Sequence, residues 1–202
     1  MPSSPEHRIA ALVLAAGRSR RLGRPKQLLP YGTGGLLDAV LGTARETGFD
    51  QIVVALGGAS DAVRRSVDTS GCDVVDNAAY ADGCSSSIVA AITALHPQTE
   101  TVVLLLGDQP GVTPATVHTL LAARGDAPLA VCHYDDGVGH PFAFHRLLFP
   151  LLEQLHGDKA VWKLLEQRAA DVVEVAIPGP VPLDVDTEED YRQVLAALRS
   201  TP

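Results

Sequence analysis

Short apolar runs rich in β-branched residues alternate with helical patterns along the first two thirds of the chain. The predicted strands of this part are 9–15, 51–56, 72–76 and 101–106, and the predicted helices are 36–47, 59–67, 85–95 and about 113–123. This rhythm indicates a parallel sheet covered by helices on both faces. The run Val-Val-Leu-Leu-Leu at 102–106 is the most apolar, so we expect it at the centre of the sheet. The predicted fold class is α/β, a Rossmann-like three-layer fold with a mainly parallel sheet.

The sequence after residue 128 is less regular. Its predicted strands are 129–133, 141–145 and 172–176, and its predicted helices are 147–155, 160–167 and 187–199. We expect a glycine-rich turn at 137–139 between the first two of these strands, because glycine favours turns. We also expect a single domain over residues 1–202, with a flexible N-terminus of about residues 1–8.

The charge balance argues against two classes of partner. The net charge is −8 and the sequence pI is about 5.2, whereas a general nucleic-acid binder carries a basic face. No apolar run reaches the roughly 20 residues that span a bilayer, and the polar start MPSSPEHR lacks the apolar core of a signal peptide. We therefore expect no nucleic-acid partner, no membrane association and a cytoplasmic location. The three cysteines lack metal-ligand spacing and are expected to be buried or incidental thiols: Cys72, Cys84 and Cys132.

A loop of small and basic residues follows the first predicted strand. It reads Ala15-Ala16-Gly17-Arg18-Ser19-Arg20-Arg21-Leu22-Gly23-Arg24-Pro25-Lys26. Small residues let backbone amides approach a ligand closely, and converging amides bind phosphate oxygens. Four arginines and a lysine within nine positions supply positive charge for a triphosphate. The loop lacks the endings of a Walker A motif and of a dinucleotide fingerprint, and a solvated basic loop is the alternative.

A first candidate metal ligand follows the central predicted strand. Asp108 stands there in the sequence Gly107-Asp108-Gln109-Pro110. Ligands of open α/β sheets bind at the carboxyl ends of the strands. Mg²⁺ favours one or two carboxylates together with water and substrate phosphates, so Asp108 is well placed for it. A simple turn aspartate is the alternative.

A second group of carboxylates precedes the last predicted helix. Asp184 and Asp186 are two residues apart, so in an extended segment they share a face, with Val185 directed into the core. Thr187 and Asp190 form a pattern similar to a capping box and are expected to serve the helix start. The two aspartates before the helix are therefore the candidates for a metal site.

Two further segments offer polar groups for a nucleotide or an acceptor. Residues 77–88 lead into a helix with Gly83 and three serines, and free N–H groups and hydroxyls at a helix start form an anion or base pocket. Ordinary N-capping by one serine is the alternative. His140, in Gly139-His140-Pro141, is a candidate for binding an acceptor phosphate or assisting proton transfer. A histidine that only packs in a turn is the alternative there.

The residues from 14 to 29 resemble the signature of the MobA-like NTP transferase family. They read Leu14-Ala15-Ala16-Gly17-x-Ser19-x-Arg21-x-Gly23-x-Pro25-Lys26-Gln27-Leu28-Leu29. Within the family, the chain is most similar to the molybdenum cofactor cytidylyltransferase branch. The resemblance implies a fold of the nucleotide-diphospho-sugar transferase type. It also implies that Lys26, Arg21 and Asp108 are catalytic, and that Asp108 and Asp186 hold Mg²⁺ (or Mn²⁺).

The resemblance implies two further sets of contacts. The nucleotide-binding residues would be Leu14, Ala15, Ala16, Gly17, Arg18, Ser19, Lys26, Asn77, Gly83, Ser85 and Ser86, and the acceptor-binding residues would be His140, Gly157 and Asp158. The chain departs from the branch in this last region. The branch commonly reads Gly-Asp-x-Gly-Ala-Arg, whereas this chain has Ala160 and Trp162 in place of the second glycine and the arginine. The substitution removes a phosphate partner from the acceptor side, although Trp162 is also compatible with the core face of a helix.

The function that the resemblance implies is metal-dependent transfer of a nucleoside monophosphate from an NTP. The receiving molecule would be a small phosphorylated acceptor, with molybdopterin as one candidate, and pyrophosphate would leave. Ala16 favours CTP, because guanylyltransferases of the family tend to have glycine there, and one methyl group discriminates by about 1–3 kcal/mol. A guanylyl- or sugar-phosphate nucleotidyltransferase and a non-catalytic nucleotide-binding protein that handles cofactors stay open. A molybdoenzyme or a chaperone is the candidate protein partner.

Overall fold

A seven-stranded sheet forms the centre of the protein, in the strand order β5-β4-β1-β6-β8-β7-β9. The computed structural model describes residues 8–157 and 159–200. The strands of the sheet are β1 (Arg8–Ala15), β4 (Gln51–Leu56), β5 (Asp73–Asp76), β6 (Thr99–Leu106), β7 (Leu129–Tyr134), β8 (Gly137–His145) and β9 (Val172–Ala176). Only β8 runs antiparallel to its neighbours within this sheet. The predicted mainly parallel α/β fold is confirmed, and the predicted flexible segment lies outside the described residues except for Arg8.

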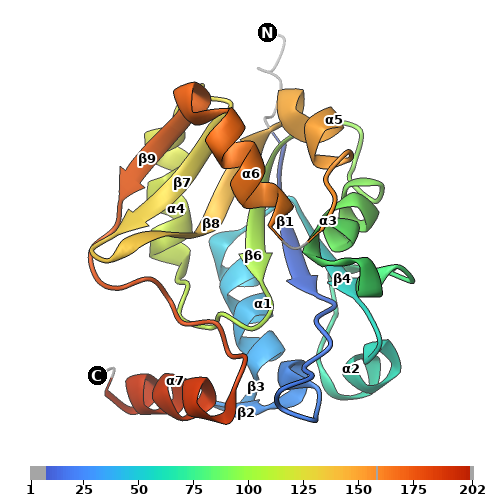
Figure 1. Cartoon of the computed structure of the whole chain (residues 1–202). Helices are drawn as coiled ribbons and strands as arrows, with labels where there is room; N and C mark the ends of the chain where they lie inside the picture. The colour runs from blue at the N-terminus through green and yellow to red at the C-terminus, as the bar shows by residue number, and fades with distance from the viewer. Residues whose placement is uncertain (1–7, 158, 201–202) are drawn as a thin grey trace, which may run out of the picture.

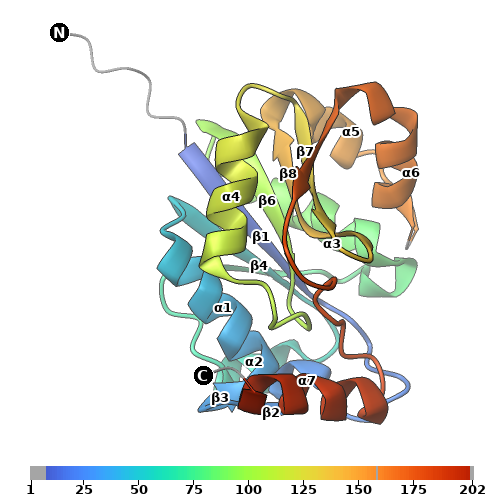
Figure 2. The ribbon, with the colours of Figure 1, turned by 90° about the vertical axis from the view of Figure 1, so that its left-hand side faces the viewer.

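Helices cover both faces of the sheet, which gives three layers (Figure 1, Figure 2). One face carries α1 (Leu36–Thr47) and α4 (Pro114–Arg124), and the other carries α3 (Cys84–Ile92), α5 (Phe149–Leu152) and α6 (Ala160–Gln167). Each strand contributes side chains to both faces of the sheet, because successive side chains point to opposite faces. In β1, Ala11 and Val13 pack with α1, while Ala10 and Leu12 pack on the side of α3. Among the described residues, no helix is long and apolar enough to cross a membrane.

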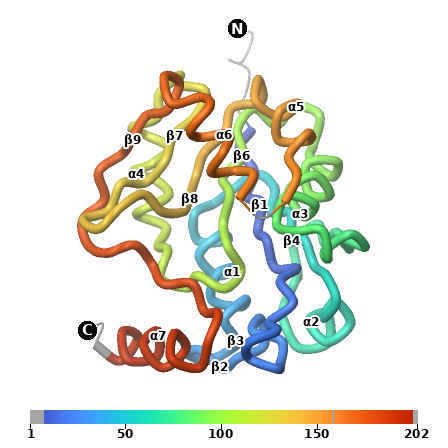
Figure 3. The backbone as a smooth tube through the Cα atoms, viewed as in Figure 1, coloured from blue at the N-terminus to red at the C-terminus, as the bar shows by residue number. Residues whose placement is uncertain are grey.

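The hairpin that follows the N-terminal loop and the C-terminal helix lie at the same end of the molecule (Figure 3). The small hairpin of β2 (Pro30–Tyr31) and β3 (Gly34–Gly35) lies beside the C-terminal helix α7 (Glu188–Ser200), while α2 (Ser60–Ser66) lies nearby. A separate apolar cluster holds this corner together, with Leu22, Leu29 and Leu36 packed against Val185 and Val194. The Tyr191 hydroxyl also donates a hydrogen bond of 2.5 Å to the Pro30 carbonyl oxygen. The C-terminal segment is thereby fixed against the N-terminal loop.

Two local predictions after residue 128 are corrected. Gly137 to Gly139 do not form a turn but begin β8, because β7 and β8 pair as far as Tyr134 and Gly137. A Cβ at Gly139 would lie 2.6 Å from Val181 Cγ1, so the glycine lets the C-terminal segment close against the strand. The predicted helix 147–155 is a short 3₁₀ turn followed by α5, which ends at Leu152.

The order of the strands creates a switch point between β1 and β6. The chain leaves β1 toward β4 and β5 on one side and returns to β6 on the other side. In open α/β sheets, the crevice at the carboxyl ends of such neighbouring strands is where ligands bind. Here the two strand ends are joined by a hydrogen bond of 2.9 Å from the Gly107 amide to the Leu14 carbonyl oxygen. The glycine loop and Asp108 therefore start from the same place.

Candidate functional site

A cavity of about 560 Å³ opens at the carboxyl ends of β1 and β6. We call it the first cavity. Nine of the residues predicted for the site line it: Leu14, Ala15, Ala16, Gly17, Arg18, Lys26, Gly83, Asp108 and Asp186. Sequence reasoning did not assign Gln27, Arg20 or Tyr80, which also line this cavity. The clustering of basic residues in the loop was the sequence signal that could have assigned Arg20 to the site. The position of Tyr80 in the cavity wall depends on contacts between segments, which the sequence pattern does not show.

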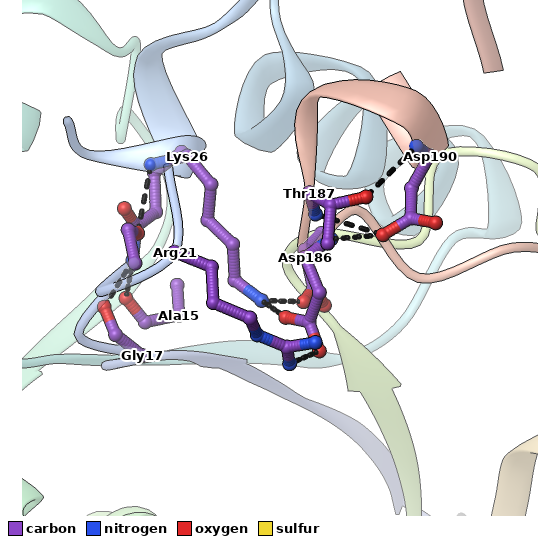
Figure 4. Close-up of polar contacts among 10 residues, drawn as sticks. Ala15, Gly17, Arg21, Lys26, Asp186, Thr187 and Asp190 are labelled. Atoms are coloured by element: carbon purple, nitrogen blue, oxygen red, sulfur yellow. Dashed lines mark hydrogen bonds and ion pairs between the residues drawn. The ribbon is translucent and has the colours of Figure 1, made fainter. Parts of the chain in front are cut away.

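The glycine loop is held in shape by Gln27. Its buried side chain donates hydrogen bonds from Nε2 to the carbonyl oxygens of Ala15 at 2.6 Å and Gly17 at 3.3 Å. The Lys26 amide donates to Ser19 Oγ at 2.9 Å. These bonds fold the end of the loop back onto its beginning, as Figure 4 shows for Ala15, Gly17 and Lys26. Lys26 consequently enters the cavity that the start of the loop lines.

Gly57, at the end of β4, allows a close approach to this loop. A Cβ at Gly57 would lie 2.6 Å from the Ala16 carbonyl oxygen and 2.9 Å from Tyr80 Cβ. We predict that Gly57→Ala lowers the free energy of unfolding by about 1–3 kcal/mol, because the added methyl group must displace backbone. Urea unfolding measures the change.

The control for that variant is Gly42→Ala in α1, where an added Cβ meets no atom within 4 Å. Alanine in the middle of a helix is expected to raise the free energy of unfolding by about 0.5–1 kcal/mol. If the two variants changed stability in the same direction, the close packing at Gly57 would not be what the position requires.

An ion cluster lies at the mouth of the loop. The Lys26 ammonium is paired with Asp108 Oδ2 and donates a hydrogen bond of 2.7 Å to Asp186 Oδ1. Arg21 Nη2 reaches the other oxygen of Asp186 at 2.5 Å, and Figure 4 shows both cationic side chains directed at that carboxylate. Asp108 and Asp186 are 78 residues apart in the sequence, and they converge, as predicted, on the ammonium nitrogen of Lys26.

The electrostatics of the cluster follow from this geometry. The side chains of Lys26 and Asp108 are only 12% and 14% exposed. Burial alone would lower the pKa of Lys26, but the charges and hydrogen bonds of Asp108 and Asp186 outweigh it and raise that pKa. Burial alone would raise the pKa of Asp186, but the hydrogen bond and charge of Lys26, with the charge of Arg21, lower it. Lys26 and Asp186 are thus both held in their charged forms.

The helix start of α7 positions Asp186. Thr187 Oγ1 accepts a hydrogen bond of 3.2 Å from the Asp190 amide, and Asp190 Oδ2 accepts one of 2.7 Å from the Thr187 amide. The predicted capping box is therefore confirmed. Val185 is fully buried, as predicted, and its amide donates to the Asp108 carbonyl oxygen at 3.1 Å. The segment that carries Asp186 is thereby attached to the loop that carries Asp108.

Asp184 occupies a different place from Asp186. It lines the first cavity but makes none of the contacts with Lys26 that Asp186 makes. Burial raises the pKa of Asp184 to about 6, and the negative charge of Asp108 adds to the effect. Of the two candidates, it is Asp186 that shares the cation of Lys26 with Asp108.

The donor set fits a divalent metal ion. Two carboxylates from separate segments already converge on one positive charge, and Mg²⁺ commonly takes one or two carboxylates, with water and substrate phosphates completing its shell. Within 8–157 and 159–200, no group of three or more His, Cys, Asp and Glu side chains is arranged to hold a metal by itself. A metal bound here would consequently need oxygen ligands from a substrate or from water.

Three residues predicted to contact the nucleotide are not among those that line the first cavity: Asn77, Ser85 and Ser86. Asn77 is 5% exposed and its amide donates to Ser86 Oγ at 2.8 Å and Ser87 Oγ at 3.0 Å. Its hydrogen-bonding capacity is thus used to join the loop to the start of α3. Ser87, the next serine along, is the one that lines the cavity.

A basic hollow of about 620 Å³ adjoins the first cavity on the outer side of the loop. Both the first cavity and the hollow are lined by Gly17, Arg18, Arg20 and Tyr80. Ser19 lines the hollow but not the first cavity. The guanidinium carbon of Arg18 lies 5.4 Å from the centre of the Tyr80 ring, within the range of a cation–π interaction. The loop therefore presents positive charge on both of its sides.

A second cavity of about 230 Å³ lies next to the first. The two cavities share Cys84, Leu106 and Asp184 in their walls. His140, predicted for the acceptor side, and Trp162 line the second cavity. Of the other acceptor-side predictions, Gly157 lies outside both linings and Asp158 lies outside the described residues.

Comparisons with known proteins give a family match and a similar curated protein. Residues 11–172 match the model of the MobA-like NTP transferase domain. The chain is 28% identical over 186 residues to the molybdenum cofactor cytidylyltransferase of Escherichia coli K12, covering 91% of this chain and 93% of that protein.

Solved structures of other proteins share this fold. Rv0371c of Mycobacterium tuberculosis H37Rv is 49% identical, with a TM-score of 0.87 over 94% of this chain and 97% of that one, and another structure of that protein is a complex with manganese. A nucleotidyl transferase from Methanothermobacter shares the fold at 22% identity, with a TM-score of 0.83 over 96% and 99% of the two chains.

Proposed function

The chain belongs to the MobA-like NTP transferase family, and on that premise we propose that it is a metal-dependent nucleotidyltransferase. It transfers the nucleoside monophosphate of an NTP, with CTP preferred, to a small phosphorylated acceptor and releases pyrophosphate. The observation that carries the proposal is the convergence of Lys26, Asp108 and Asp186 at the switch point of the sheet, beside a basic glycine loop. A solvated surface loop would not direct its lysine into a cavity toward two aspartates from distant segments.

The loop binds and orients the triphosphate in this proposal. Its small residues let backbone amides reach phosphate oxygens, and Arg18 and Arg20 line both the first cavity and the basic hollow beside it. Lys26, with Arg21 beside it, stabilises the charge that develops on the α-phosphate and on the leaving pyrophosphate. The β- and γ-phosphates then extend along the side of the loop where the arginines gather.

Asp108 and Asp186 would hold Mg²⁺ (or Mn²⁺). When bound, the metal supplies charge neutralisation for the in-line displacement at phosphorus. The chain's own contribution is to keep the two carboxylates together, through the capping box of α7 and the hydrogen bond from the Val185 amide to Asp108. The manganese complex of the mycobacterial relative supports the choice of a divalent ion.

Molybdopterin is the specific acceptor that we propose first, on the name of the relative from E. coli. A phosphate oxygen of the acceptor would attack from the side of the second cavity, which adjoins the first through Asp184, Leu106 and Cys84. A molybdoenzyme or its chaperone would then be the protein that receives the product.

Pyrophosphate release tests the proposal. Each of the four NTPs is incubated with the protein, with Mg²⁺ or Mn²⁺, and with a panel of phosphorylated acceptors that includes molybdopterin. We expect release that requires both an acceptor and the metal, and that EDTA abolishes. Tight NTP binding without turnover on any acceptor would favour a non-catalytic nucleotide-binding protein instead.

We predict that CTP is preferred over GTP because of Ala16. This residue lines the first cavity and is 6% exposed, where the chain leaves β1. A methyl group there narrows the space for a purine, and steric exclusion rejects a larger base more firmly than contact rewards a smaller one. Steady-state competition between the two nucleotides measures the preference.

The companion variant is Ala16→Gly, which should reduce the preference for CTP over GTP by roughly 10–200-fold, the discrimination that one methyl group provides. A wild-type preference for GTP, or a ratio unchanged by Ala16→Gly, would show that Ala16 does not read the base.

A further inference from the structure

The second cavity differs in chemistry from the first. Its apolar walls come from Leu104 of β6, Val138 of β8, Val161 of α6 and Val181 of the C-terminal segment. The polar side chains of its lining are Gln109, His140 and Asp184. Among the described residues that line it, none is arginine or lysine, whereas Arg18, Arg20 and Lys26 all line the first cavity. A phosphate or carboxylate that entered the second cavity would consequently be desolvated without a cationic partner, which is costly.

An aromatic group forms one side of the second cavity. The His140 ring stacks on Phe142 with the ring centres 4.1 Å apart, and Trp162 meets Phe142 edge-on at 5.3 Å. Trp162 keeps 39% of its surface exposed and lines the cavity. Ligand pockets are typically lined by apolar and aromatic side chains that accept the uncharged part of a ligand. Trp162 is thus half-packed against protein and half available to a ligand.

His140 adds no charge to this wall. Burial lowers the pKa of its imidazole to about 4, so the ring is neutral at physiological pH and offers hydrogen bonding without attracting an anion. The predicted phosphate-binding role of His140 is weakened on this ground. Trp162 stands where the related branch commonly has an arginine, so the chain has no cation at that position either.

We propose that the second cavity binds an uncharged, ring-containing part of the acceptor and discriminates against acceptors that carry an anionic group there. The inference rests on the proposed function, because it takes the adjoining first cavity as the place of the nucleotide and of the attacking phosphate. The volume of about 230 Å³ exceeds the roughly 150 Å³ that accommodates benzene in a protein interior. Trp162 is the residue that determines this specificity.

The single tryptophan of the sequence makes the cavity directly observable. Protein labelled with 5-fluorotryptophan gives one ¹⁹F resonance, from Trp162. It is titrated with 1,4-benzenedimethanol and with terephthalate, which share a ring, but terephthalate carries a charge at each end. An anion must then enter the cavity in either orientation of the ring. We expect a saturable shift with the diol and at least tenfold weaker binding of terephthalate.

Two outcomes of that titration overturn the proposal: terephthalate binding as tightly as the diol, or no saturable shift with either probe. The variant Trp162→Arg restores a cation, and ligand-observed saturation-transfer NMR should then reverse the preference toward terephthalate. An unchanged preference in Trp162→Arg would equally contradict the role of Trp162.

A filling variant and a matched control complete the test. Val138→Phe places a larger side chain in the cavity wall and should abolish diol binding, while Leu147→Phe, at a position 73% exposed and outside the lining, should not. Binding of CTP with Mg²⁺ and pyrophosphate release are measured on the same samples. Diol binding without turnover on any acceptor contradicts the proposed function alone, whereas turnover with a preference for terephthalate contradicts this inference alone.

Discussion

Asp108→Asn is expected to lower pyrophosphate release by about 10³-fold or more, the cost of removing a group that stabilises transition-state charge. The side chain is 14% exposed and paired with Lys26, and asparagine has nearly the same shape but no charge. It cannot replace the carboxylate as a metal ligand of comparable strength. Release is measured at saturating CTP and Mg²⁺ with the acceptor that the panel identifies.

The fold should survive Asp108→Asn, because Lys26 keeps Asp186 as a partner at 2.7 Å. Circular dichroism and thermal unfolding check this. Asp126→Asn, at an exposed position of the loop after α4, is the control and should leave release unchanged. Metal-dependent activity at the wild-type level in Asp108→Asn would remove Asp108 from the metal site.

Lys26→Ala is expected to lower kcat/KM by roughly 10²–10³-fold, because one preorganised positive charge near the α-phosphate is lost. Among the described residues, Lys26 is also the only one that forms an ion pair with both Asp108 and Asp186. Removing the lysine leaves the negative charges of two converging carboxylates with less positive charge beside them. Mn²⁺ affinity without nucleotide should therefore be kept or raised in Lys26→Ala, whereas it should fall in Asp108→Asn.

That contrast separates the two roles. A parallel loss of Mn²⁺ affinity in both variants would mean that Lys26 organises the metal site and does not act on the phosphates. Lys163→Ala, an exposed lysine of α6, is the matched control and should match the wild type in both measurements. Wild-type kinetics in Lys26→Ala would mean that the basic loop is only a charged surface.

The parts of the fold that were predictable are those in which neighbouring residues decide the structure. The strands 51–56 and 172–176 and the helices 36–47 and 160–167 have the bounds that hydrophobic periodicity indicated. The capping box of α7 was also readable, because its partners are three residues apart. The glycine loop was found for the same reason, since its small and basic residues are consecutive.

Predictions failed where a distant segment changed the meaning of a local pattern. The glycines 137–139 looked like a turn, but β7 pairs with them and Val181 packs against Gly139. Val181 lies outside the local pattern, so the pattern could not contain its contact with Gly139.

The sequence by itself determined the α/β class, the membership suggested by residues 14–29, and the types of side chain that the site contains. Only the tertiary structure decided that Asp108 and Asp186 meet on the ammonium group of Lys26, and that Trp162 faces a cavity without cations in its described lining. The physical reason is the range of the forces. Backbone propensity and side-chain alternation act over a few residues, whereas ion pairs and cavities arise when packed strands bring segments from opposite ends of the chain together.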